Sequence, residues 1–130
     1  MELKIGNKTY ELYFGIDFLR QVDKNYGMSV GGDTVNMNFG YGLISLLAQL
    51  EAKSPVAIFD TIKAATNTLD QKPSNAAIED FIAECDFDEV VESFFVAIEQ
   101  SKIASKVLST IGAAIGAEEK KETKEETKED

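Results

Sequence analysis

Residues 1–27 read MELKIGNKTYELYFGIDFLRQVDKNYG, and near Gly15 the spacing of the apolar residues changes from every second position to a helical period. Before this point, apolar and polar residues alternate on both sides of Gly6-Asn7, a dipeptide that supplies the positive φ angles of a tight hairpin turn. Around and after Gly15, the apolar residues share one helical face: Phe14, Phe18, Leu19, Val22 and Tyr26. We therefore predict a two-stranded hairpin followed by an amphipathic helix that ends at Gly27.

Beyond a polar, glycine-containing loop at residues 28–38, the chain has helical periodicity to about residue 116. Residues 41–51 are apolar over most of the helical circumference, which predicts a central buried helix. Ser54 is followed by Pro55, a pair typical of a helix start, and Ser74 gives a second N-cap. These signals predict separate helices after each serine, the first of them ending near Leu69.

The predicted fold class is α+β and mostly α, with an N-terminal β-hairpin followed by a bundle of four or five helices. Residues 1–116 are expected to form this single domain. Residues 117–130 contain no apolar residue after Ala117 and consist of Glu, Lys, Thr and Asp. Because such a segment cannot bury apolar surface, we expect a disordered charged C-terminal tail.

The charge balance restricts the kinds of partner. The chain of 130 residues has a formal net charge of −10 and a pI of about 4.5. Nucleic-acid binding depends mainly on Lys and Arg that neutralise phosphates, so nucleic acid is not an expected partner. No apolar run approaches the ~20 residues of a membrane-spanning helix, and a single cysteine, Cys85, gives no intrachain disulfide. We expect a cytosolic protein with no membrane partner.

The chain lacks the residues of the common catalytic and metal sites. It contains no histidine, which removes the usual general base and the usual metal ligand. The glycines do not match a phosphate loop, and the acidic neighbours of Cys85 disfavour a thiolate. Asp86, Asp88, Glu89 and Glu92 lack the pattern of a calcium loop and are better explained as a helix cap and a solvated face. We expect no catalytic residue, metal or cofactor.

The apolar stripe shifts after residue 100, which predicts a kink or a further helix. The shifted stripe consists of Ile103, Val107, Leu108, Ile111 and Ile115. These residues have two interpretations, because an amphipathic helix either covers the core of its own domain or docks onto another chain. We assign all five as candidate residues for binding another protein.

Three segments carry a resemblance to a known family. They read ELYFGIDFLRQVDKNYG (11–27), FGYGLISLLAQL (39–50) and KPSNAAIEDFIAECDFDEVVESFFVAIEQS (72–101). In their order and spacing they resemble the tail assembly chaperones of long-tailed phages and prophages that infect Gram-positive bacteria. The motifs are patterns of apolar, glycine and proline residues, without a catalytic signature.

The resemblance implies a non-enzymatic factor of the host cytoplasm that is absent from the mature virion. Such chaperones bind the tape measure protein and keep it soluble while the tail assembles. Many also exist as a longer form, made by ribosomal frameshifting, that recruits the tail tube protein. An A-rich slippery sequence encoding Lys120-Lys121 would permit such a shift.

Two other functions remain open at this point, a structural tail completion or connector protein that stays in the virion and a small acidic regulator that binds a host protein. The oligomeric state is also open, with a homo-oligomer favoured. Each of three regions is either internal or shared between subunits: the hairpin edge, residues 41–50 and the stripe after residue 100.

Overall fold

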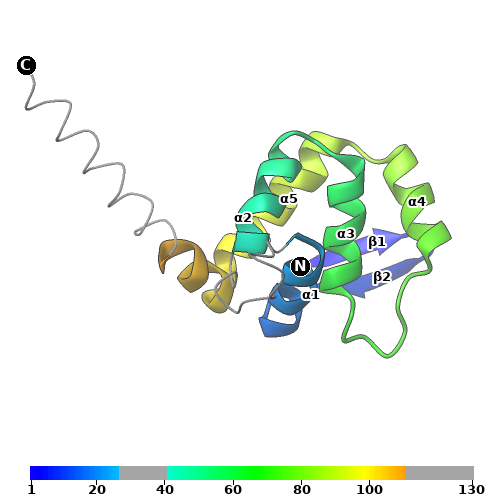
Figure 1. Ribbon diagram of the computed structural model, residues 1–130. Coiled ribbons are helices and arrows are strands. Elements are labelled where there is room, and N and C mark those ends of the chain that lie inside the picture. The colour runs from blue at the N-terminus through cyan, green and yellow to red at the C-terminus, as the bar shows by residue number, and fades with distance from the viewer. Residues whose placement is uncertain (27–40, 111–130) are drawn as a thin grey trace, which may run out of the picture.

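The computed structural model describes residues 1–26 and 41–110. Their elements are β1 (Glu2–Ile5), β2 (Lys8–Glu11), α1 (Ile16–Tyr26), α2 (Tyr41–Glu51), α3 (Pro55–Ala65), α4 (Asn75–Glu84) and α5 (Phe87–Gln100), followed by a helix over 102–110 (Figure 1). The prediction of a mostly helical α+β fold that begins with a hairpin is confirmed. The described residues hold six helices where four or five were expected, because the chain starts a new helix after α5.

The hairpin is antiparallel, with Leu3 opposite Tyr10 and Ile5 opposite Lys8. Gly6 has a φ of 63°, as the tight turn requires. The prediction of a second positive φ at Asn7 was wrong: a turn that needs positive φ only at its first central residue connects these strands.

Helices cover the apolar side of the hairpin. Ile5 is buried in the core, α4 contacts β1, and the Tyr13 amide donates to the Ala65 carbonyl at the end of α3 at 2.9 Å. Figure 1 shows the two antiparallel strands extending between the lower part of α3 and α4, with β1 running toward α4 and β2 running back. An isolated hairpin is only marginally stable, and packing against helices of the same chain stabilises this one.

Helix α2 lies at the centre of the core, as its composition predicts. Leu43, Leu46 and Leu50 are fully buried, and Gly42 lets the first turn of α2 approach α1 closely. The core is completed by apolar side chains of the other elements, among them Phe18, Leu19, Val22, Ile58, Ile62, Ile78, Val91, Phe94 and Ile98. The predicted buried face of α1 is therefore confirmed.

Polar contacts fix α1 against α3. The Tyr26 hydroxyl donates to Asp60 at 2.6 Å, and the Asn67 side chain donates to Asp17 at 3.0 Å. Because these two hydrogen bonds lie at opposite ends of α1, they set its position along α3.

The N-caps predicted at Ser54 and Ser74 are present, and Asp86 is the acidic residue that caps α5. The side chains of Ser54, Ser74 and Asp86 accept hydrogen bonds from the amides of Ala57, Ala77 and Glu89 respectively. Helix α3 ends at Ala65, with Thr66 as its C-cap, and so stops earlier than the predicted end near Leu69. The predicted helix stop at Gly27, the loop at 28–38 and the charged tail at 117–130 lie outside the described residues.

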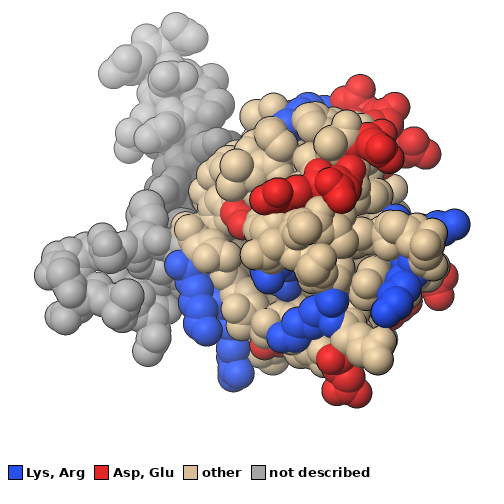
Figure 2. Space-filling model, turned by 90° about the vertical axis from the view of Figure 1, so that its right-hand side faces the viewer, with Lys and Arg blue, Asp and Glu red and all other residues tan. Residues whose placement is uncertain are grey.

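The charged groups are unevenly distributed on the surface. Figure 2 shows the right-hand side of the molecule in Figure 1, where most acidic groups lie in the upper half and most basic groups in the lower half, with some groups of the opposite sign in each. None of the helices formed by residues 1–26 and 41–110 has the length and apolarity needed to cross a bilayer.

Candidate protein-binding surfaces

Ser101 positions the helix that carries the predicted binding residues. Its amide caps the end of α5 by donating to the Ala97 and Ile98 carbonyls, and its Oγ accepts from the Ala104 amide at 3.3 Å. The same hydroxyl donates to the Phe14 carbonyl, just before α1, at 2.5 Å. One serine therefore ends α5, starts the helix at 102–110 and ties the junction to the N-terminal part of the chain.

The described part of the predicted stripe is divided between core and solvent. Ala104 is fully buried and anchors the helix, while Val107 and Leu108 are partly buried against the core. Ile103, one turn before Val107 on the same helix, is 42% exposed. Ile111 and Ile115 lie outside the described residues.

This arrangement combines the two interpretations of the stripe. One side of the helix covers the core of its own domain, as amphipathic helices usually do. Ile103 stays at the surface, where an apolar side chain of this size is available to another protein.

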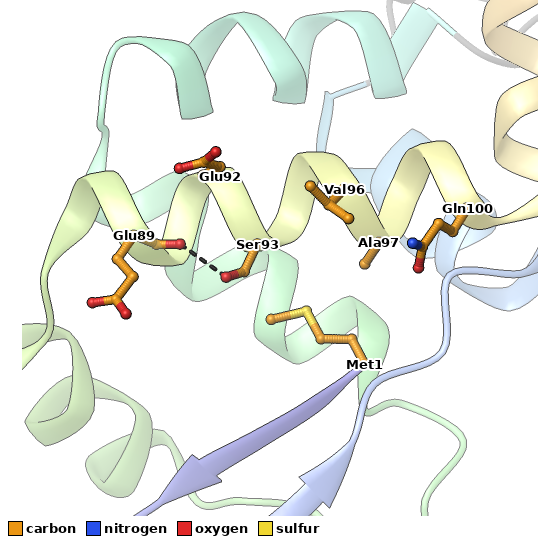
Figure 3. Close-up of a pocket in the computed structure, with 7 residues that line it drawn as sticks. All are labelled: Met1, Glu89, Glu92, Ser93, Val96, Ala97 and Gln100. Atoms are coloured by element: carbon orange, nitrogen blue, oxygen red, sulfur yellow. Dashed lines mark hydrogen bonds between the residues drawn. The ribbon is translucent and has the colours of Figure 1, made fainter.

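A second apolar surface, which the sequence analysis missed, follows the outer face of α5. Glu89, Glu92, Ser93, Val96 and Gln100 all lie on this face, because their spacing of three or four residues places them on one side of a helix. Figure 3 shows the Met1 side chain reaching toward α5 from the start of β1. Together with Ala97 these residues line a depression of about 430 Å³, which we call the α5 trough.

A neighbouring depression extends the α5 trough toward α1. It is lined by Met1, Ala97 and Gln100, which also line the α5 trough, and by residues of the segment between β2 and α1. Among these is Tyr13, which is 54% exposed. Val96 in the α5 trough is 45% exposed, so large apolar side chains are accessible in both depressions.

Helical position is the signal that would have found Val96. The buried residues of α5 are Val90, Val91, Phe94 and Ile98, and Val96 lies off that face among exposed polar residues. An apolar residue outside the core face of an amphipathic helix is a candidate contact residue. The part played by Met1 depends on where the hairpin packs, which no local pattern encodes.

A third, smaller depression lies between α3 and α4. It is lined by Pro55, Val56, Phe59, Glu79 and Ile82. Val56 is 64% exposed, although it lies in the first turn of α3 beside the buried Ala57.

The groups considered for chemistry have structural roles. Asp86 caps α5, and Asp88 pairs with Lys53 at 3.4 Å on the surface. Burial raises the pKa of the Cys85 thiol, and the negative charge of Asp86 raises it further. Its Sγ donates weakly to the Ile82 carbonyl at 3.5 Å. Within the described residues, no three metal-ligating side chains come together.

Comparison with known protein families gives a match over most of the chain. Residues 2–111 match the family model described as phage tail assembly chaperone protein, TAC. No curated protein and no solved structure matches the chain at a significant level. Because the matched region includes both strands and all the described helices, the chain belongs to the phage tail assembly chaperone family.

Proposed function

We propose that this chaperone binds the tape measure protein of its phage and keeps it soluble while the tail assembles. The observation that carries the proposal is Ile103, an exposed apolar side chain on a helix that Ser101 separates from α5. A tape measure protein is long and helical, and helices dock onto apolar ridges through anchors spaced by three or four residues.

The proposed contact surface consists of Ile103, Val107, Leu108, Ile111 and Ile115. Ile103 supplies the accessible part among the described residues, and Val107 and Leu108 support it from the partly buried side. The spacing of four residues from Ile103 through Val107 and Ile111 to Ile115 suits a helical partner that lies alongside.

The proposed action is binding without catalysis, in the cytoplasm of a host that we take to be Gram-positive. The chaperone leaves before the tail is complete. A longer form that recruits the tail tube protein, and association of the chaperone with itself, belong to the same proposal. The lack of histidine and the negative net charge of −10 support a soluble binding factor over an enzyme.

Co-purification of the tape measure protein with Ile103→Asp tests the proposal. A charge placed on the contact surface should lower the recovered tape measure protein by about tenfold or more, since each ~1.4 kcal/mol of lost binding is a factor of ten. Ser105→Asp is the matched control, because it adds the same charge to an exposed position of the same helix. Equal recovery with both variants would exclude Ile103 from the contact surface.

Mass spectrometry of purified virions tests the transient role. We expect tail tube and tape measure peptides and no peptides of this chain. Its presence in stoichiometric amount would instead indicate a structural tail component.

A further inference from the structure

We propose that the α5 trough is a second binding site, and that its occupant is a basic amphipathic helix of the partner. This inference rests on the proposed function, because it specifies which kind of partner segment is held and where. It concerns a face of the molecule formed by α5 and Met1, and the residues that line it are different from the stripe at Ile103.

The shape of the α5 trough suits a helix. Glu89 and Gln100 are separated by eleven residues of one helix, which corresponds to about 16 Å at 1.5 Å per residue. The neighbouring depression continues from Ala97 and Gln100 to Tyr13, so the accessible surface is longer than α5 alone. An elongated site of this kind matches about three turns of a docked helix.

The floor of the site is apolar. Val96 is 45% exposed, and the partly buried Met1 and Ala97 lie beside it. Figure 3 shows Val96 and Ala97 on α5, with the Met1 side chain approaching from the hairpin. Covering such side chains removes apolar surface from water, which favours an occupant with its own apolar stripe.

The charges of the lining favour a basic occupant. Glu89 and Glu92 lie at one end of the α5 trough, whereas Glu11 in the neighbouring depression already pairs with the Met1 ammonium group at 3.4 Å. Neither depression is lined by Lys or Arg, and no described basic group forms an ion pair with Glu89 or Glu92. The α4 side of the molecule, in contrast, carries charges of both signs (Figure 2). Lys or Arg residues that flank the apolar stripe of the partner would complement these carboxylates.

The same charges disfavour occupants from this chain. Residues 117–130 contain seven acidic and four basic residues, so the tail has the same sign as the lining. A second copy has a net charge of −10, which opposes its docking at this acidic face. A basic helix of another protein avoids both penalties.

The test is recovery of the full-length tape measure protein with the full chain and its variants after co-expression. Val96→Asp and Glu92→Lys should each lower recovery by about tenfold. Two controls make similar changes elsewhere on the surface: Ile16→Asp at an exposed isoleucine of α1 and Glu84→Lys at an exposed glutamate of α4. Both controls should recover as much tape measure protein as the wild type. Thermal unfolding establishes that each variant is folded, and Val96→Ser replaces Val96→Asp if the latter is not.

Each outcome decides a different point. If Val96→Asp and Glu92→Lys match their controls while Ile103→Asp fails to bind, the inference is overturned and the proposed function stands. If the wild type recovers no tape measure protein, the proposed function fails and the inference fails with it. Loss with Val96→Asp but not with Glu92→Lys would contradict a basic occupant. A dimer of the wild type that Val96→Asp dissociates, with unchanged recovery, would assign the α5 trough to a second copy and overturn the inference.

Discussion

Gly42 lies where the first turn of α2 is in close contact with α1. A methyl group at this position would lie 2.6 Å from Asp23 Oδ1, 2.9 Å from Asp23 Cα and 3.1 Å from the Val22 carbonyl oxygen. Two of these atoms belong to the backbone and cannot rotate away. Gly42→Ala should therefore lower the free energy of unfolding by about 1–2 kcal/mol, after a partial gain in helix propensity.

Urea denaturation measures this change, and Gly15→Ala is its control. A methyl group at Gly15 meets no atom within 4 Å, so that variant should lose less than about 1 kcal/mol, through weaker capping of α1 alone. A Gly42→Ala protein as stable as the wild type would show that the two helices separate easily.

Lys53 has a left-handed backbone conformation, with a φ of 59°. It follows α2, where its amide donates to the Leu50 carbonyl and the next amide, of Ser54, donates to the Gln49 carbonyl. This pattern normally contains glycine, since a side chain strains the left-handed region. Lys53→Gly should raise the free energy of unfolding by about 0.5–1 kcal/mol, as measured by thermal and urea unfolding.

Lys53→Ala separates this effect from the surface ion pair. Alanine keeps the strain and removes the contact with Asp88, whose side chain is 85% exposed. Exposed pairs contribute little, so this variant should have nearly the stability of the wild type. Equal gains with glycine and alanine would contradict relief of strain as the cause.

Tyr26 couples stability to alkaline pH. Burial raises the pKa of its hydroxyl above the ordinary value, and the hydrogen bond to Asp60 and the negative charge of Asp60 raise it further. The folded state therefore favours the neutral phenol, and this contribution is complete below the unfolded pKa of about 10 and is lost as the pH rises toward the folded pKa.

Urea unfolding at pH 7, 10 and 11 tests this coupling. Between pH 10 and 11 the wild type should lose up to about 1 kcal/mol more than Tyr26→Phe, after a discount for solvent screening at this partly exposed hydroxyl. Parallel losses in the two proteins would contradict the coupling.

Among the helices, the junction between α5 and the helix at 102–110 depends on one side chain. Ser101→Ala removes the hydrogen bond to the Phe14 carbonyl and the cap of the Ala104 amide. The expected loss is about 1–2 kcal/mol, with faster hydrogen exchange at the amides of 102–110. Ser105→Ala, at an exposed position of the same helix, should change stability by less than about 0.5 kcal/mol. Unchanged exchange in Ser101→Ala would show that Ser101 does not hold the helix.

The elements that local chemistry specifies were predictable from the sequence. Ser54, Ser74 and Asp86 each cap the helix that follows, because a capping side chain needs only the amides of its own first turn. The hairpin was predictable for the same reason, although the second positive φ, at Asn7, was not correct. The left-handed Lys53 was missed, because its neighbours impose a conformation that lysine does not prefer.

The surfaces were less predictable, because they depend on contacts between distant parts of the chain. The stripe predicted around Ile103 includes residues that pack on the core, since Ser101 holds the helix against the segment before α1. Met1, from the start of the hairpin, lines the α5 trough together with residues of α5. The outward position of Val96 was readable from helical spacing, whereas the opposite wall of the trough was not.

Taken as a whole, the molecule is an acidic helical domain with apolar side chains exposed on several faces. Val56, Val96 and Ile103 lie on α3, on α5 and on the helix at 102–110 respectively, so a long partner is able to contact more than one of them. The net charge of −10 limits self-aggregation of such a surface. This combination is consistent with the proposed binding of a partner's apolar stripe by a chaperone that stays dispersed.

The soluble fraction of the tape measure protein, with and without this chain, tests the central claim most directly. The tape measure protein is expressed alone, with the wild type, or with Ile103→Asp, and its supernatant and pellet fractions are quantified. We predict that most of it pellets when expressed alone, becomes soluble with the wild type, and pellets again with Ile103→Asp. The same soluble fraction with and without the wild-type chain would contradict the account.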